Sequence, residues 1–315
     1  MKDQPGRLLK RLNQEKYLQI MAIMGLLWML IFNYMPMYGL LVAFKKNFRI
    51  TQSLFSRDFL VSPWADFGGF SHFLTFLKDP EFPNILLNTL GISVFSLIFG
   101  FPLPIIFTLL LNELPSGRFK KNVQTISYLP HFLSWVVLGG ILSTWLSDVG
   151  FFNEILIKLR LIKQGTTYLA YPNYFWAIII ISQIWKELGW SAIIYLAAIA
   201  GIDQEIYEAA ALDGVGRFRR MWSITLPCIM GTITILLILS IGGLLNSNFE
   251  QILVLWNPLN SPRSTVIDIY TYTVAMRSMR FSYASAIGLF KSVVALILLL
   301  SANKITKKIS NFSFF

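Results

Sequence analysis

Six long stretches of apolar residues are the feature that most limits how this chain can fold. The first runs from Tyr17 to Phe44 without a charged side chain. It is long enough to cross the roughly 30 Å hydrocarbon layer of a bilayer as a helix. Further runs cover about 84–112, 123–147, 173–201, 227–248 and 281–303. The sequence therefore predicts an all-α polytopic membrane protein with six transmembrane helices.

The composition agrees with a membrane location. Of the 315 residues, 55% are hydrophobic and 14% are charged, whereas soluble domains are typically about 25% charged. A net charge of +11 would suggest nucleic acid as the partner of a soluble protein. Here the basic residues are spread among the segments between the apolar runs, where they suit lipid headgroups. We expect membrane lipid as a partner and no nucleic acid.

The polar segments divide the chain into an arm, a first span, an external loop, a core and a tail. The arm and the tail are basic, and we expect both on the cytoplasmic side of a bacterial inner membrane. The first run is longer than the apolar part of a signal peptide and lacks a small-residue cleavage site, so we expect it to remain. The expected ranges are 1–16, 17–44, 45–83, 84–303 and 304–315.

The distribution of Lys and Arg supports this orientation. The four segments predicted to be cytoplasmic carry slightly more of these residues than the three on the other side, which favours cytoplasmic termini under the positive-inside rule. The cytoplasmic set is 1–16, 113–122, 202–227 and 304–315, and the external set is 45–83, 148–172 and 257–280.

The polar loop 202–227 stands apart from the apolar runs on either side of it. Asp203 is a good N-cap for a helix that continues through Leu212. Gly214 then ends this helix, because glycine tolerates the left-handed turn that such an end needs. A second short helix, basic along its length, is expected from Val215 to about Thr225. Pro227 suits the first turn of the next apolar helix.

The sequence from Glu208 to Gly214, Glu-Ala-Ala-Ala-Leu-Asp-Gly, followed by Ile224-Thr-Leu-Pro227, resembles the cytoplasmic "EAA" loop of permeases in binding-protein-dependent ABC importers. Three further segments are similar to permeases of the oligosaccharide branch, such as the first permease of alginate-type importers. They are Tyr34–Gly39, Trp185–Trp190 and Ala286–Ser292. The resemblance implies a MetI-like core of five spans preceded by one extra N-terminal span.

The resemblance also implies how the chain is used. The loop 202–227, named the coupling loop below, would place a coupling helix on a cytoplasmic ATPase. Partners would be a second homologous permease, two ATPase subunits, an external solute-binding protein and an oligosaccharide. The sequence contains no G-x-x-x-x-G-K-[ST] phosphate loop, so ATP and Mg²⁺ belong to the ATPase and this chain is a transport subunit without a cofactor. The implied coupling residues are Asp203, Glu205, Tyr207, Glu208, Ala209, Ala210, Ala211, Asp213, Gly214 and Arg217.

Charged and aromatic side chains inside the apolar runs are candidates for a translocation path. A charge at this depth costs at least about 2.5–3.5 kcal/mol on insertion scales, so it usually faces a cavity or a partner. Alternatively, Lys186 and Glu187 compensate each other locally and Lys291 reaches a headgroup. Adjacent helical residues point about 100° apart, so Lys186 and Glu187 should not face one cavity. The candidates are Trp185, Lys186, Glu187, Trp190, Tyr195 and Lys291.

Other classes of function stay open at this stage. The two histidines, His72 and His131, and the single Cys228 match no metal-ligand spacing. An ion-coupled secondary transporter could use the intramembrane charges, although no internal inverted repeat is visible. A scaffold or sensor explains the spans but not the Glu-Ala-Ala loop. Within the ABC importers, the solute could belong to another class, and the oligosaccharide could contact this chain or its partner.

Overall fold

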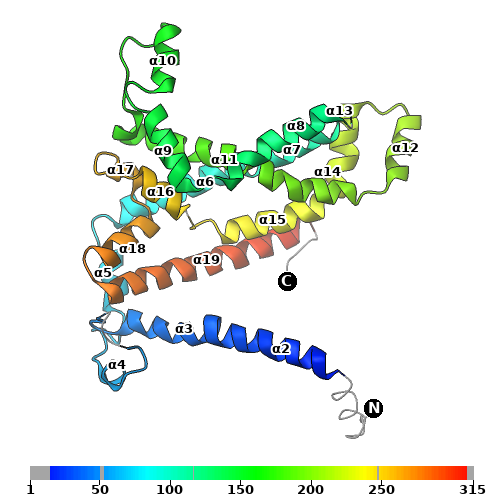
Figure 1. The fold of residues 1–315 in the computed structure, drawn as a ribbon. Helices are drawn as coiled ribbons and strands as arrows, with labels where there is room; N and C mark the ends of the chain where they lie inside the picture. Colours follow the sequence, from blue (N-terminus) through cyan, green and yellow to red (C-terminus); the bar gives the residue numbers. More distant parts are fainter. Residues whose placement is uncertain (1–14, 50–52, 116, 247, 311–315) are drawn as a thin grey trace, which may run out of the picture. The chain divides into compact units, whose positions relative to one another are not determined.

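The computed structural model describes residues 15–49, 53–115, 117–246 and 248–310, and these residues are helical apart from short connections and one isolated bridge. The chain forms two compact units, one of Met1–Phe76 with Val274–Leu289 and the other of Leu77–Thr273 with Phe290–Phe315. Figure 1 shows the elements of each unit. The basic arm 1–16 lies almost entirely outside the described residues.

The first unit contains the first predicted span. Its helical segments follow each other without a break from Lys16 to Phe44, and this stretch is long and apolar enough to cross a membrane. The segments are α2 (Lys16–Met29), a π-turn (Leu30–Tyr34), α3 (Met35–Met37) and a 3-10 helix (Tyr38–Phe44). The loop beyond it contains α4 (Arg57–Val61) and the start of α5 (Ser71–Leu77).

A buried lysine organises the loop of the first unit. Lys45 is 3% exposed, and its Nζ donates to the carbonyl oxygens of Leu60 at 3.1 Å and Ser62 at 2.7 Å. The same ammonium group lies 4.3 Å from the centroid of the Trp64 ring. These contacts compensate for the loss of water around the charge. Lys45 therefore ties the start of the loop to residues 60–64.

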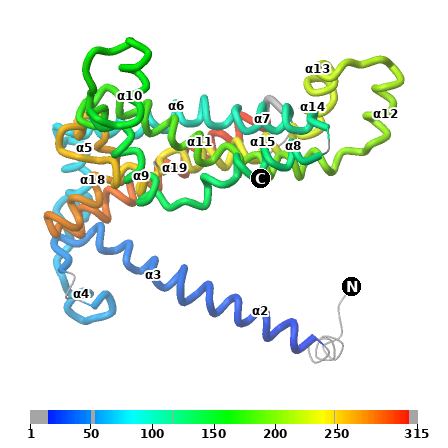
Figure 2. The backbone as a smooth tube through the Cα atoms, turned by 45° about the horizontal axis from the view of Figure 1, so that its top comes forward, coloured from blue at the N-terminus to red at the C-terminus, as the bar shows by residue number. Residues whose placement is uncertain are grey.

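The second unit contains the remaining helices. Its central element is α11 (Pro172–Ala200), which packs against α6 (Phe82–Gly100), α7 (Pro102–Asn112) and α8 (Arg118–Tyr128). Figure 2 shows α6 and α11 running side by side. The other elements are α9 (Trp135–Trp145), α10 (Phe151–Lys158), α12 (Gln204–Leu212), α13 (Arg217–Arg220), α14 (Leu226–Cys228), α15 (Met230–Gly242), α16 (Phe249–Leu255), α17 (Ser261–Ser264), α18 (Ile267–Met276) and α19 (Phe281–Ser310), of which α18 and α19 continue into the first unit.

Four helical stretches in the described part of the chain are each long and apolar enough to cross a membrane, and two bent pairs bring the total to six if each pair is one span. The four are Lys16–Phe44, Phe82–Asn112, Pro172–Ala200 and Phe281–Lys307. The pairs are Arg118–Phe132 with Trp135–Trp145, bent by 99°, and Arg217–Cys228 with Met230–Gly242, bent by 65°.

The third predicted run differs from the structure because it is not one straight helix. A 3-10 turn containing Pro130 ends its first half, since proline donates no backbone hydrogen bond. Leu133 is extended, with φ −79° and ψ 134°. Ser134 then starts α9, and its Oγ accepts from Val137 N at 3.3 Å. The first half also begins at Arg118, inside the turn predicted over 113–122.

The coupling-loop side of the fifth run also differs from the prediction. The second short helix begins at Arg217 rather than Val215, and it stays helical through Pro227 to Cys228. A π-turn over Met221–Thr225 ends two residues before this proline, and the π-turn before Pro36 in the first span has the same spacing. The wider turn accommodates the missing N–H. The bend lies at Ile229, with φ −95° and ψ 6°.

Two further boundaries move. The fifth run ends at Gly242 in α15 instead of continuing to Asn248, and a separate helix, α16, begins at Phe249. The last helix continues to Ser310, so the first part of the predicted tail is helical.

Two apolar cores hold the second unit around α11. One lies between α6, α11 and α16. The other lies between α7, α11, the π-turn over Met221–Thr225 and the start of α15. The first core contains Ile92, Leu169, Phe175, Ile179, Ile252, Leu255, Val266 and Ile269. The second contains Ile105, Leu109, Tyr195, Ile199, Met221, Ile229 and Ile233.

Candidate functional site

Helix α12 of the coupling loop is capped at both ends by its own sequence. Asp203 Oδ1 accepts from Glu205 N at 3.1 Å, as predicted for the N-cap. At the other end Gly214 N donates to Ala211 O at 3.1 Å, and the next amide donates to Ala210 O at 3.0 Å. Gly214 has φ +70°, so this Schellman turn needs a residue that tolerates the left-handed region. The predicted start and stop of the helix are confirmed.

The alanine residues of α12 do not share one face. Ala210 is 6% exposed, whereas Ala209 and Ala211 are open to solvent. Glu205, Glu208, Asp213 and Arg217 are exposed as well. Sequence reasoning missed the exposed large apolar side chains of the same loop, of which Ile206 is 43% exposed. Leu212 is 91% exposed, Phe218 70% and Trp222 57%.

A polar chain of contacts ties the loop to the spans. Tyr207 Oη lies 3.0 Å from Thr225 Oγ1 in the π-turn. The guanidinium group of Arg220 lies 5.7 Å from the centroid of the Tyr207 ring, and its Nη2 donates to Glu113 Oε2 at 2.5 Å. Glu113 is the C-cap of α7. Of these four residues only Tyr207 was a predicted site residue.

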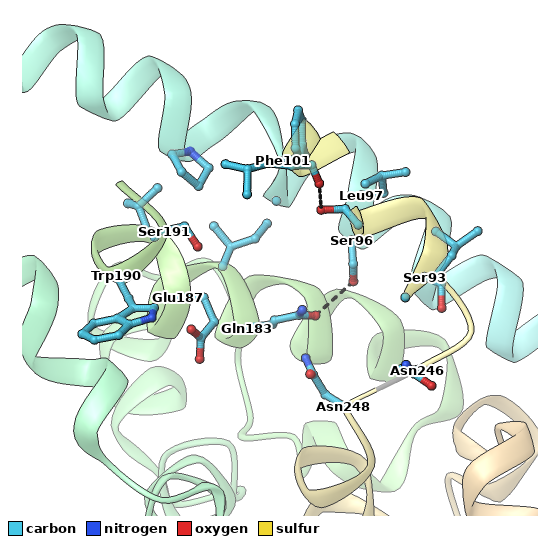
Figure 3. A pocket seen from close by; sticks show the side chains of 18 of the residues that line it. Ser93, Ser96, Leu97, Phe101, Gln183, Glu187, Trp190, Ser191, Asn246 and Asn248 are labelled. Carbon is cyan, nitrogen blue, oxygen red and sulfur yellow. Dashed lines mark hydrogen bonds between the residues drawn. The ribbon is translucent and has the colours of Figure 1, made fainter. Parts of the chain in front are cut away.

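A cavity of about 350 Å³ lies within the second unit, between α6, α7, α11, α15 and the segment that follows α15. Figure 3 shows side chains from these elements converging on it. Its polar and aromatic lining includes Ser93, Ser96, Gln183, Glu187, Trp190, Ser191, Tyr195, Ser240, Asn246 and Asn248. Ser96 Oγ donates to Gln183 Oε1 at 3.1 Å, and Ser93 Oγ is buried without a partner among the described residues. Hydroxyl and amide groups both donate and accept, so the cavity suits a hydroxyl-rich solute.

Glu187 carries the one formal charge among the described residues that line the cavity. Its Oε2 lies 2.9 Å from His131 Nδ1 and its Oε1 lies 3.4 Å from Lys186 Nζ. Lys186 Nζ also donates to His131 O at 2.5 Å. The His131 ring stacks on Trp190, with centroids 4.2 Å apart and an interplanar angle of 1°. This cluster joins α11 to the turn that breaks the third run.

The sequence that forms this loop and cavity matches a known protein family. Residues 100–311 match the inner membrane component of binding-protein-dependent transport systems. The chain belongs to this family. The permease is therefore a multi-pass transport subunit and not an enzyme. The matched region contains the whole loop 202–227 and all of the cavity lining except the residues of α6 before Gly100.

Relatives cover almost the whole permease. Protein LplB of Bacillus subtilis (strain 168) is 43% identical over 298 residues, which are 94% of this chain and 90% of LplB. The polygalacturonan/rhamnogalacturonan transport system permease protein YteP of the same organism is 40% identical over 308 residues, 98% of this chain and 92% of YteP.

Solved structures share the fold. A chain of a bacterial ABC transporter involved in the import of the acidic polysaccharide alginate has a TM-score of 0.86 and 39% identity, covering 96% of this chain and 99% of that one. A chain of the alginate transporter in complex with an alginate pentasaccharide-bound periplasmic protein has a TM-score of 0.85 and 37% identity, covering 98% and 99%.

The permease brings together only some of the predicted path residues. Glu187, Trp190 and Tyr195 line the cavity, whereas Trp185, Lys186 and Lys291 do not. Lys186 Nζ lies 3.4 Å from Glu187 Oε1, so the two charges compensate each other locally, and of the two residues only Glu187 lines the cavity, as expected. Lys291 Nζ pairs with Asp268 Oδ1 on α18 at 2.5 Å. Lys291 was predicted to face a cavity or a partner, or to reach a headgroup, and this ion pair instead compensates its charge within the chain.

Several cavity residues were missed by sequence reasoning. Gln183 and Ser191 lie four residues before and after the predicted Glu187 on α11, which places all three on one helical face. This periodicity of polar residues inside an apolar run could have predicted a polar face on α11. The contact of His131 with Glu187 joins positions 56 residues apart, so no local pattern predicts it. Among the described residues, no group of three His, Cys, Asp or Glu side chains could hold a metal ion.

Proposed function

We propose that the permease is half of the membrane pathway of an ABC importer for oligosaccharides. The observation that carries the substrate class is the cavity of about 350 Å³ lined by hydroxyl, amide and aromatic side chains. Sugars offer hydroxyl groups for the former and apolar ring faces for the latter. A cavity of this size lies at the lower end of the range for ligand pockets, so it accommodates part of a longer chain. The names of YteP and of the alginate importer support the same class.

Membership of the family supports the remaining subunits of the complex. A second homologous permease completes the pathway, and two cytoplasmic ATPase subunits bind ATP and Mg²⁺. An external binding protein delivers the sugar, as the periplasmic protein in the complex of the structural relative suggests. Both termini lie in the cytoplasm of a bacterial inner membrane, each bent helix pair is one span, and Lys16–Phe44 precedes a MetI-like core of five spans.

The chain's own residues then have distinct roles in transport by alternating access. Closure of the ATPase subunits moves α12, which contacts them through its exposed face, including Glu205, Glu208 and Leu212. The capped ends keep α12 rigid during this movement. Glu187, Trp190 and Tyr195 contact the sugar in the cavity, and Lys186 with His131 holds Glu187 in place.

The experiment uses proteoliposomes with the intact complex, purified through this permease, and with its binding protein outside. Two labelled probes are offered, the neutral pentasaccharide maltopentaose and an oligogalacturonate of the same length. We expect uptake of at least one probe that requires enclosed ATP and Mg²⁺. Uptake that needs no ATP and follows an imposed proton gradient would contradict the proposal and favour a secondary transporter. ATP-driven uptake of neither sugar, but of an amino acid mixture, would reject the substrate class.

A further inference from the structure

We infer that the ion pair between Glu113 and Arg220 is the mechanical link that carries movement of the coupling loop to the wall of the cavity. This inference rests on the proposed ATP-driven function, and it names two positioning residues for it. Neither residue is among the predicted coupling residues, and neither lines the cavity.

The position of Glu113 is not explained by the stability of its own helix. It is the C-cap of α7, where the partial negative charge of the helix end repels a carboxylate. Its side chain is only 10% exposed, so the charge has also lost most of its water. A buried charge at this place requires a cation. Arg220 supplies it from the last residue of α13, on the far side of the coupling helix in the sequence.

The pair uses only part of its hydrogen-bonding capacity. Arg220 Nη2 bonds to Glu113 Oε2, while Glu113 Oε1 and Arg220 Nε are both buried and have no partner among the described residues. A guanidinium and a carboxylate can form two parallel hydrogen bonds, and this fork is the stronger arrangement. The pair can therefore gain a second bond when the loop moves, so its strength depends on the position of the loop.

The link is continuous on both sides of the ion pair. On the loop side, Arg220 lies against the Tyr207 ring of α12, and the Tyr207 hydroxyl bonds to Thr225. On the membrane side, α7 has 11 residues and is about 16 Å long. Pro104 in its first turn lines the cavity at the end opposite Glu113. Since a helix transmits displacement along its axis, a pull on Glu113 reaches the cavity wall.

The apolar core around α7 couples a movement of α7 to the helices on either side of it. Ile105 and Leu109 of α7 pack in one core with Met221 and Ile229 from the segment that carries the coupling loop. Thr108 Oγ1 donates to Ala192 O of α11 at 3.3 Å. Close-packed cores transmit strain rather than absorb it. The ion pair holds the C-terminal end of α7, at Glu113, which lies beyond the α7 residues of this core.

The test measures ATP hydrolysis and sugar uptake side by side in the proteoliposomes described above. Glu113→Gln removes the charge at constant size, and Arg220→Lys keeps the charge but loses the fork. We expect both variants to retain ATP hydrolysis and to lower the sugar taken up per ATP by about fivefold or more, the usual lower limit of a coupling between two sites. The charge-reversed double variant, Glu113→Arg with Arg220→Glu, should recover most of the ratio.

The controls separate this link from a folding defect and from the proposed function itself. Arg219→Gln changes an exposed base on the same helix and should leave the ratio unchanged. If Glu113→Gln fails to assemble with the ATPase subunits, the ratio of uptake to ATP hydrolysis in Arg220→Lys and in the double variant tests the link instead. An unchanged ratio in these variants, or a lowered ratio that charge reversal does not recover, would overturn the link. Absence of ATP-driven uptake in the unaltered complex would instead reject the proposed function.

Discussion

At the scale of single residues, the coupling loop depends on one backbone conformation. Gly214 has φ +70°, and no atom lies within 4 Å of the position that a Cβ would occupy. A side chain would therefore meet no obstacle, and only the left-handed backbone opposes it. That conformation costs an L-residue about 1–2 kcal/mol. The glycine is required by the turn and not by packing.

We expect Gly214→Asp to reach the membrane in normal amounts but to lower ATP-driven uptake strongly. The strained turn tilts α12, and the new charge lies beside the exposed face that we assign to the ATPase. Uptake and the amount of ATPase that copurifies measure the effect. Gly216→Ala is the matched control, because Gly216 has φ −67° and open space around it. Full activity of Gly214→Asp would argue against a coupling role for α12.

Glu187 illustrates how one residue can serve both the cavity and the fold. We expect Glu187→Gln to destabilise the permease by about 1–3 kcal/mol, because it leaves the Lys186 ammonium buried without its carboxylate. The value lies below the about 3–5 kcal/mol of a fully buried pair, since Glu187 is 35% exposed. Thermal unfolding in detergent measures the loss.

A second variant tests the electrostatic reason for that loss. Lys186→Met combined with Glu187→Gln should be more stable than Glu187→Gln alone, because no unpaired buried charge remains. Glu154→Gln disrupts an ion pair between exposed side chains on α10 and should change little. Equal stability of the single and double variants would mean that the cluster is not held by charge.

At the scale of elements, the turn in the third run places His131 beside α11. This placement depends on a close approach of α8 to α11 at Gly189. A Cβ at this position would lie 2.1 Å from Ser127 O, a backbone atom that cannot move by itself. The two helices can meet there only because residue 189 has no side chain.

We expect Gly189→Ala to cost about 1–3 kcal/mol through overpacking and to separate His131 from Glu187. Thermal unfolding in detergent measures the cost. Gly140→Ala is the control, since it also adds one methyl group to a helix of this run but meets no atom within 4 Å. Similar midpoints for the two variants would contradict the close contact of α8 and α11.

At the scale of the whole molecule, the bent pair Arg118–Phe132 with Trp135–Trp145 decides the topology. If the pair crosses the membrane, Lys121 and Lys158 lie on opposite sides. If it enters and returns on one side, they lie on the same side, and the coupling loop would then face outward. The proposed function requires the first arrangement.

We expect a membrane-impermeant maleimide to label Lys158→Cys from outside the cell, and Lys121→Cys and Arg219→Cys only after the membrane is opened. Each variant carries Cys228→Ser, because Cys228 is the one native cysteine and is exposed. Outside labelling of both Lys121→Cys and Lys158→Cys, or protection of both, would show that the pair does not cross.

The sequence by itself determined the helical membrane class, four of the spans and the capped coupling helix. These features depend on local properties: long uncharged runs, an aspartate before an alanine-rich helix, and a glycine after it. Only the tertiary structure decided where the runs bend and which polar side chains meet. His131 pairs with Glu187, Arg220 with Glu113, and Lys291 with Asp268 across gaps that no local pattern encodes. Inside a membrane a charge must find a partner, but the packing of helices selects which one.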